Sequence, residues 1–519
     1  MSTLYKVCTY SLSLVTFTPS AAMASLALIC LLAVAAAIAA AIAESAVAPG
    51  TKPNIILLFN DDQDITLGGT TPMAFTEKLM STGATVDNFF VNTPVCCPSR
   101  TTLLSGGYPH NWHTTTGGCM HMNVMNDQFR QRTIGIYMKA LGYTTGQFGK
   151  LLNPNGVAAY CAKTNAVPVP GFDSYLTMCN DNRYFGNTFT SNGTFVEKGK
   201  DPEDYLTSVI GNHSLDFIEA SLQAGRPFFA YISPHAPHVP ATPAPWYADK
   251  FSDKQAPRTP NYNYSAADHH YVIRSQPILT SKEGNESDAL FRDRWRSLLS
   301  VDDITKDVVS LLEKYDQVDN TYILWTSDHG FQLGQFRLPS CKLQPYDHDI
   351  RVPFRIKGPG LKQGSHSFVA SMVDVAPTII ELGGGTVPEE MDGHSFASLL
   401  MSDSSAPKDE TRDRMTIEYW TLGNVIRYGH YIDMPNNTYI GIRLVNDTHN
   451  YLYVEYYQDV KEMKFTDKGF EFELFDVSKD PYQMKNLYGT PEADDQLVTE
   501  LHEYLHKQVV CKGQEECKL

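Results

Sequence analysis

NIILLFN, residues 54–60, is a short and largely apolar run between Pro53 and Asp61. A run of this length is typical of a strand that is buried on both faces, as in a parallel sheet. FFAYIS at 228–233 and YILWTS at 322–327 have the same character. Between these runs, apolar residues recur three and four apart, which is the period of a helix, at 134–141, 205–222 and 298–315. Strands that alternate with helices predict an α/β fold with a central, mostly parallel sheet.

Polar side chains follow the three predicted strands. Asp61 and Asp328 come directly after the first and third runs, and His235 follows the second. The carboxyl ends of parallel strands lie at one edge of a sheet, and ligands bind there. The pattern alone therefore predicts a site at this edge that contains all three residues.

The remaining segments divide the chain. Residues 236–290 are rich in Pro, Asn, Tyr and Ser and lack periodicity, so we expect a long surface excursion near the mouth of the site. The polar stretch 401–412 is expected as a boundary. Short β-like runs and a closing helix follow it, at 415–420, 439–445, 451–457 and 494–508. We expect a main domain at 52–400 and a small C-terminal α+β subdomain with an antiparallel sheet at 413–519.

Composition limits the function. The chain has 519 residues, of which 42% are hydrophobic and 19% charged, so it is globular rather than disordered. Its net charge of -16 makes it a poor non-specific nucleic-acid binder, and we expect no nucleic-acid partner. An anionic substrate would therefore need a local cluster of cations.

The first 48 residues predict entry into the secretory pathway. There is no charged residue between Lys6 and Glu44, and an apolar run begins at Leu26. We expect a signal peptide at 1–48, with an uncleaved membrane anchor as the alternative. The destination stays open between the extracellular space, the periplasm or cell wall, and the lysosome.

Sequons and cysteines agree with that route. Six Asn-x-Ser/Thr sequons are candidate glycosylation sites, namely Asn192, Asn212, Asn263, Asn285, Asn436 and Asn446. Cys161 and Cys179, and likewise Cys511 and Cys517, are close enough in sequence to suggest local disulfides. The adjacent pair Cys96-Cys97 is poorly suited to bridging itself.

The densest motif is NTPVCCPSRTTLLSGGYPH at 92–110, which contains Cys96-x-Pro98-Ser99-Arg100. Taken alone, it also fits a buried cysteine pair before a helix. Further pieces follow in order along the chain: Asp61-Asp62, Gly149-Lys150, His235-Ala236-Pro237-His238, Asp328-His329, Cys341-Lys342 and the segment ELFDVSKDPYQMKNL at 473–487. Each piece alone is weak: the two aspartates could be an N-cap pair, the lysine could simply be solvated, and the two histidines could bind zinc only with a third strong ligand nearby. Their joint order makes coincidence a poor explanation.

Together these motifs resemble the sulfatase family over nearly all of the chain, closest to its N-acetylglucosamine-6-sulfatase and arylsulfatase group. The resemblance implies an alkaline-phosphatase-like α/β sandwich with a C-terminal subdomain. It also implies that a formylglycine-generating enzyme oxidises Cys96 to formylglycine. The hydrate of that aldehyde would attack sulfur and later collapse to release sulfate, a step that a plain serine could not perform.

The resemblance assigns further roles. It implies a calcium ion held by Asp61, Asp62, Cys96, Asp328 and His329. Arg100 would steady the hydrate and the carboxylates. Sulfate would be bound by Lys150, His235, His238 and Lys342, and His238 or Lys342 would protonate the leaving oxygen.

Two positions depart from the family pattern. Many members have Asn where His329 stands, and nitrogen is an unusual ligand for calcium. Many also have a histidine where Leu152 stands, so the base that releases sulfate is unassigned, with His235 as one candidate. We expect a sulfuric ester hydrolase that acts on an aryl sulfate or a sulfated sugar. A phosphodiester or phosphonate monoester hydrolase of the same superfamily and an inactive glycan-binding protein are the alternatives, and the oligomeric state is left open.

Overall fold

The computed structural model describes residues 52–114, 119, 127–401, 412–458, 465 and 469–518. The predicted signal peptide or anchor at 1–48 lies outside the described residues, as does most of the expected boundary at 401–412. Among the residues that are described, no helix combines the length and the apolar character needed to cross a membrane.

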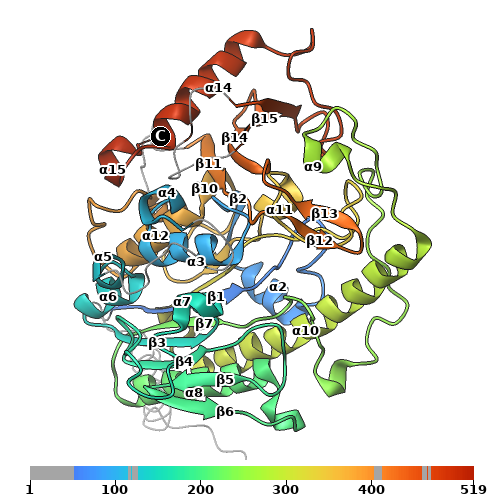
Figure 1. Ribbon diagram of the computed structural model, residues 1–519. Coiled ribbons are helices and arrows are strands. Elements are labelled where there is room, and N and C mark those ends of the chain that lie inside the picture. Colours follow the sequence, from blue (N-terminus) through green and yellow to red (C-terminus); the bar gives the residue numbers. More distant parts are fainter. Residues whose placement is uncertain are drawn as a thin grey trace, which may run out of the picture. The chain divides into compact units, whose positions relative to one another are not determined.

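A large mixed sheet forms the centre of this part of the chain (Figure 1). Its strands lie in the order β10 (Gly364–Ser371), β2 (Ala84–Phe90), β9 (Arg355–Lys357), β8 (Thr321–Ser327), β1 (Asn54–Asn60), β7 (Phe228–Ser233), β3 (Thr144–Gly149), β4 (Ser174–Met178), β5 (Thr188–Ser191) and β6 (Thr194–Glu197). The run from β8 through β1, β7 and β3 to β4 is parallel. The mostly parallel sheet predicted from the sequence is confirmed.

Both faces of the sheet are covered. Along β1, Ile55 and Leu57 pack into one apolar cluster, whereas Ile56 and Leu58 pack into another. The first cluster is shared with α6 (Ile134–Ala140), α3 (Cys96–Ser105) and α12 (Val375–Leu382); the second with α2 (Ala74–Met80), α8 (Leu206–Gln223) and α10 (Ser281–Lys314). Alternate side chains of one strand therefore serve two cores, which is why the run is apolar at consecutive positions.

Helix α10 is longer than the sequence predicts. Its N-cap is Thr280, whose hydroxyl accepts from the backbone N–H of Glu283 while the Glu283 carboxylate accepts from the Thr280 N–H. This capping box starts the helix inside the segment 236–290, so the expectation that this whole segment is irregular is wrong. The first turns bury Gly284, Ser287 and Asp288, which give no apolar period.

The C-terminal region confirms the predicted antiparallel sheet. It contains β11 (Arg414–Tyr419), β14 (Thr438–Val445), β15 (Asn450–Tyr457) and β16 (Glu471–Asp476). Helix α14 (Asp495–Gln508) covers one face with Leu497, Leu501 and Leu505. The opposite face, through residues such as Leu452 and Val454, belongs to the same cluster as the central sheet. The division into 52–400 and 413–519 stays a prediction.

Shorter elements complete the described chain. A hairpin of β12 (Val425–Arg427) and β13 (His430–Asp433) was not expected from the sequence. The short helices are α4 (Pro109–Trp112), α5 (Asp127–Gln131), α7 (Pro154–Val157), α9 (Tyr271–Arg274), α11 (Asp347–Ile350), α13 (Ala397–Leu400) and α15 (Gly513–Glu516). Single 3-10 turns lie at Pro202–Asp204, Pro245–Tyr247, Val318–Asn320 and Met372–Asp374.

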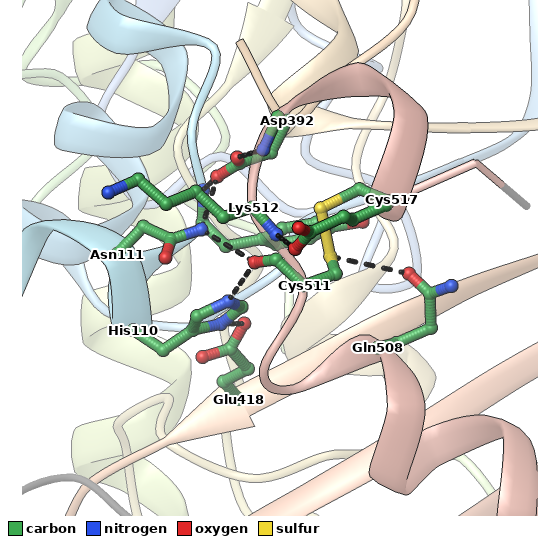
Figure 2. Close-up of a disulfide and its surroundings, with 11 residues drawn as sticks. His110, Asn111, Asp392, Glu418, Gln508, Cys511, Lys512 and Cys517 are labelled. Atoms are coloured by element: carbon green, nitrogen blue, oxygen red, sulfur yellow. Dashed lines mark hydrogen bonds and ion pairs between the residues drawn. A yellow bond between two sulfur atoms is a disulfide. The ribbon is translucent and has the colours of Figure 1, made fainter. Parts of the chain in front are cut away.

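Disulfides join both suggested pairs, Cys161–Cys179 and Cys511–Cys517. Figure 2 shows the second pair beside His110 and Asn111 of α4, which both contact the Cys511 carbonyl. A third disulfide joins Cys97 to Cys119 and leaves Cys96 as a buried free thiol.

The six sequon asparagines are all in the described part of the chain. Asn192, Asn212, Asn285 and Asn446 are exposed, whereas Asn263 and Asn436 are half-buried. Their glycosylation stays a prediction.

Candidate active site

Four strand ends supply the centre of the site. Asp61 follows β1, Lys150 follows β3, His235 lies just beyond β7, and Asp328 follows β8. These strands are neighbours in the sheet, and Asn60 is in register with Ser327, so the two aspartates leave the sheet side by side. The structure thus brings together the residues that the strand pattern pointed to.

Glycine is required where β3 meets β7. Gly149 has a φ of +103°, and a Cβ there would lie 2.0 Å from the Ser233 carbonyl oxygen. Because no side chain intervenes, the Lys150 N–H donates to that same oxygen at 2.8 Å. This close approach aims the Lys150 side chain at Asp61.

Asp61 lies among several cationic side chains of the site. Its Oδ2 accepts from Lys150 Nζ and from His235 Nδ1, both at 2.7 Å, and its Oδ1 lies 3.5 Å from Arg100 Nη2. Burial by itself would raise the pKa of Asp61. The nearby positive charges, led by Lys150, outweigh burial and hold this pKa well below its usual value. Asp61 is therefore a buried anion.

Asp62 and Asp328 form the second half of the anionic group. Lys342 Nζ lies 2.7 Å from Asp62 Oδ1, while Asp62 Oδ2 is buried without a hydrogen-bond partner. Arg100 Nε donates to Asp328 Oδ2 at 2.9 Å. Asp62 has a φ of +67°, and its backbone N–H donates to Asp328 Oδ1, which fixes this strained turn.

The donor atoms fit a divalent cation. Ligand atoms of Asp61, Asp62, Cys96 and His329 all lie within 4.8 Å of one another and are buried. His329 Nδ1 lies 3.0 Å from the Gly330 carbonyl oxygen, so it carries the hydrogen. Its Nε2 is thereby turned toward Asp62 Oδ1, 3.4 Å away, and Asp328 Oδ1, 3.5 Å away. Converging acceptors, one of them an unpartnered carboxylate oxygen, are what a bound cation requires.

Cys96 is the first residue of α3 and its thiol is 3% exposed. The sulfur lies 3.4 Å from His329 Nε2 and 3.7 Å from Asp61 Oδ1. Burial raises the pKa of the Cys96 thiol to about 12, in spite of the two nearby lysines. An unmodified Cys96 is therefore a neutral thiol and a weak nucleophile.

The opening of the site lies beside His238 and Lys342. Their side chains are 10% and 12% exposed, whereas those of Asp61, Asp62, Arg100, His235, Asp328 and His329 are fully buried. Burial holds the pKa of His238 well below its usual value despite the nearby Asp62 and Asp61. The carboxylates, led by Asp62, hold the pKa of Lys342 above its usual range against the effect of burial. The mouth thus presents a neutral imidazole and an ammonium group.

Two supporting residues were missed from the sequence. Ser233 Oγ accepts from Arg100 Nη1 at 2.8 Å and donates to the Phe59 carbonyl. Arg294 of α10 donates to the Asp62 carbonyl at 2.7 Å and to Asp64 Oδ1 at 2.6 Å. A serine at the end of an apolar strand and an arginine in an amphipathic helix carry no local signal of such a role.

Comparisons with known proteins agree with this geometry. The sulfatase family model matches residues 53–385, and a model described as the C-terminal part of N-sulphoglucosamine sulphohydrolase matches 341–510. The N-acetylglucosamine-6-sulfatase of Capra hircus is 34% identical over 488 residues, or 89% of this chain and 84% of that protein. An arylsulfatase of Chlamydomonas reinhardtii is 29% identical and aligns with 91% of this chain and 76% of its own length.

A solved structure shows the same architecture. The protein BT4656, in complex with its substrate D-glucosamine-2-N,6-O-disulfate, superposes with a TM-score of 0.72 at 21% identity. The match covers 90% of this chain and 98% of that one. The expected alkaline-phosphatase-like fold, with its central sheet and C-terminal antiparallel sheet, is confirmed.

Proposed function

The chain belongs to the sulfatase family and is a sulfuric ester hydrolase, and from this premise we propose that it removes the 6-sulfate from a glucosamine-type sugar. The observation that carries the hydrolase chemistry is the position of Cys96 at the start of α3, clustered with the buried carboxylates of Asp61 and Asp62 and facing two lysines. The choice of sugar is supported by the similarity to N-acetylglucosamine-6-sulfatase over 89% of this chain. An aryl sulfate is the second candidate substrate, because an arylsulfatase aligns over most of the chain.

We propose that Cys96 is oxidised to formylglycine by a formylglycine-generating enzyme, and that Asp61, Asp62, residue 96, Asp328 and His329 hold a calcium ion. The carboxylates of Asp61 and Asp62, together with Asp328 Oδ1 at 3.5 Å from His329 Nε2, favour a hard cation over zinc, although His329 adds one nitrogen. The modified residue would supply a hydroxyl nucleophile. The cation, when bound, would supply positive charge for the sulfate oxygens.

The chain's own residues position the ester. We infer that Lys150 and Lys342 bind the sulfate oxygens and that His238 joins them when its Nε2 takes up a proton in the presence of the anion, because its Nδ1 already faces the Val239 carbonyl oxygen. Arg100 holds Asp61 and Asp328 in place. The N-terminus of α3 adds a partial positive charge beside residue 96. Lys342 lies at the opening and carries a proton at Nζ, so it is placed to protonate the leaving oxygen.

His235 is our candidate for the base that releases sulfate. Its Nδ1 is hydrogen-bonded to Asp61, and its Nε2 is buried without a hydrogen-bond partner. An aspartate hydrogen-bonded to one ring nitrogen fixes the orientation of the ring and directs the other nitrogen toward its target. This role fills the position left open at Leu152.

We further propose a secretory location, lysosomal or extracellular. Disulfides persist in oxidising compartments, and three are present among the described residues.

The test begins with protein secreted from a eukaryotic host. The mass of the tryptic peptide carrying Cys96 is measured, together with turnover of N-acetylglucosamine 6-sulfate and of a chromogenic aryl sulfate, with and without chelator. We expect the formylglycine mass, turnover that chelator removes, and its loss in Cys96→Ala. Cys341→Ser, which removes a second buried free thiol of the described residues, is the matched control and should retain turnover.

Three results would contradict the proposal. An unmodified thiol in folded, inactive protein would favour the glycan-binding alternative. Turnover of a phosphodiester or phosphonate in place of a sulfate ester would favour the other hydrolases of the superfamily. Turnover that persists in the presence of chelator would contradict the proposed role of calcium in the reaction.

A further inference from the structure

A second group of metal-binding side chains lies in the C-terminal region, on elements other than those that form the active site. Helix α14 carries His502 and His506, and strand β15 carries Glu455. Ligand atoms of these three residues all lie within 4.8 Å of one another. Figure 1 shows α14 beside the C-terminal sheet that contains β15. We name these three residues the α14 cluster.

The spacing of the two histidines places them on one face of the helix. They begin and end the run HEYLH at 502–506, and side chains four residues apart in a helix are neighbours. Their ring centroids are 4.4 Å apart. Each histidine follows a leucine that packs against the sheet, Leu501 and Leu505, so the rings lie at the edge of the buried stripe. The run also matches H-E-x-x-H, a pattern that presents two histidines of a helix to a zinc ion.

Glu455 supplies a carboxylate beneath the two rings. Its side chain is fully buried under α14, on the face of the sheet that the helix covers. Glu455 Oε1 lies 2.7 Å from His502 Nδ1, and Glu455 Oε2 lies 3.1 Å from His506 Nε2. Each carboxylate oxygen therefore faces one ring nitrogen.

Two tyrosines on the same strand hold this carboxylate in place. The Tyr453 hydroxyl donates to Glu455 Oε1 at 2.9 Å, and the Tyr457 hydroxyl donates to Glu455 Oε2 at 2.7 Å. Carboxylates that bind a metal are commonly hydrogen-bonded in this way by an outer shell of polar groups. The carboxylate is thus oriented toward the histidines by residues that are themselves fixed in the sheet.

The ligand atoms suit zinc better than calcium. Calcium prefers a shell of oxygen atoms, whereas zinc accepts histidine nitrogen together with carboxylate oxygen. Bonds of about 2.0–2.2 Å place tetrahedral zinc ligands roughly 3.3–3.5 Å apart, so the rings need to move by less than about 1 Å. The side chains of His502 and His506 are 41% and 22% exposed, which gives an ion access from solvent and leaves room for a water ligand.

We propose that the α14 cluster binds a zinc ion, with His502 Nδ1, His506 Nε2 and the Glu455 carboxylate as ligands and water in the fourth position. The ion takes the place of the hydrogens that lie between the rings and the carboxylate in the metal-free protein. It joins α14 to β15 and holds the helix over the outer face of the C-terminal sheet. The site is separate from the sulfate chemistry, so this inference does not rest on the proposed function.

The first experiment measures zinc binding to the full secreted protein by equilibrium dialysis in the presence of calcium. His502→Gln and His506→Gln should each raise the Kd for one zinc ion by more than about 100-fold, since even outer-shell changes typically cost 10- to 100-fold. Tyr453→Phe removes such an outer-shell donor and should raise the Kd by about 10- to 100-fold. Zinc bound elsewhere in the protein is common to all variants and cancels in the comparison.

Glu503→Gln is the matched control. Glu503 lies between the two histidines on the same helix and is exposed, so its variant should bind zinc like the wild type. In thermal unfolding, zinc should raise the Tm of the wild type and of Glu503→Gln, but not that of His502→Gln or His506→Gln. Glutamine can still donate a hydrogen bond to Glu455, so we expect both histidine variants to fold.

A measurement on the wild type alone covers the case in which a variant fails to fold. With free zinc at about ten times its Kd, diethylpyrocarbonate should modify His502 and His506 about 10-fold more slowly. The tryptic peptide 486–507 reports both, because it contains no other histidine. His449, which is half-buried and outside the cluster, should react equally with and without zinc. Equal zinc binding by the wild type and the folded histidine variants, or no protection of this peptide, would overturn the proposal.

Discussion

At the scale of the residue, the site is held by charges that compensate one another away from water. Lys150 is 2% exposed in its side chain and lies 2.7 Å from Asp61. Taking two charges out of water is costly, and removing one partner leaves the other unpaired. The stability of the site therefore depends on how many cations face its carboxylates.

This dependence predicts how Lys150→Met responds to metal. The variant leaves Asp61 without its closest cation, at an expected cost of about 3–5 kcal/mol when chelator is present. A divalent cation in the site replaces the missing charge, so calcium should restore part of the Tm in differential scanning fluorimetry. Lys314→Met, which breaks an exposed pair with Glu219, is the control and should cost little in either condition. A Tm loss in Lys150→Met that calcium does not change would contradict the metal site.

At the scale of the element, α4, β11 and the C-terminal segment meet at one histidine (Figure 2). His110 Nδ1 lies 2.8 Å from Glu418 Oε1, and Nε2 lies 2.9 Å from the Cys511 carbonyl oxygen. Both ring nitrogens face acceptors, which favours the imidazolium. Burial lowers the pKa of His110, but Glu418 outweighs burial and raises this pKa to about 9.

The raised pKa predicts a pH-dependent contribution to stability. Because the folded pKa is above the unfolded value of about 6.5, the contribution is complete below pH ~6.5 and is lost as pH rises toward 9. Wild type should lose on the order of 3 kcal/mol over this window relative to His110→Gln. Urea unfolding at a series of pH values measures the difference. Parallel pH curves for the two proteins would show that the imidazolium contributes nothing.

The elements also show what the sequence could predict. Strands β1, β7 and β8 were predictable because burial on both faces leaves a continuous apolar run. The start of α10 was not, because its buried face is made of small and polar residues. The β12–β13 hairpin was missed because its strands are short and expose apolar side chains such as Ile426.

The residues of the active site were likewise predictable only in part. Strand ends and family motifs led to Asp61, Cys96 and Asp328, because these residues occur in recognisable local patterns. Arg294 could not be found, since its contact with Asp62 joins two segments that only the tertiary fold brings together.

At the scale of the whole molecule, the C-terminal sheet is part of the main core. Its outer face is covered by α14, and its inner face shares one apolar cluster with the central sheet. Separating the two parts would expose that inner face to water, which is costly because apolar burial is a main source of stability.

The shared core predicts joint unfolding. Scanning calorimetry of the whole protein should give one main transition that includes both sheets, and a fragment of residues 413–519 should not fold alone. Near-ultraviolet circular dichroism of that fragment provides the second measurement. Two well-separated transitions, or a folded fragment, would show that the sheets are independent.

The burial of Cys96 has a consequence for how an active molecule is made. Only 3% of the surface of Cys96 is exposed, so a modifying enzyme has no access to this side chain in the folded protein. On the proposal that Cys96 is oxidised to formylglycine, oxidation and folding compete in time within each newly made chain, and a chain that folds first keeps its thiol. The specific activity of a preparation then depends on the ratio of the rate of Cys96 oxidation to the rate of folding during biosynthesis. A host that folds the protein faster than it oxidises the cysteine will yield soluble, well-folded and inactive molecules.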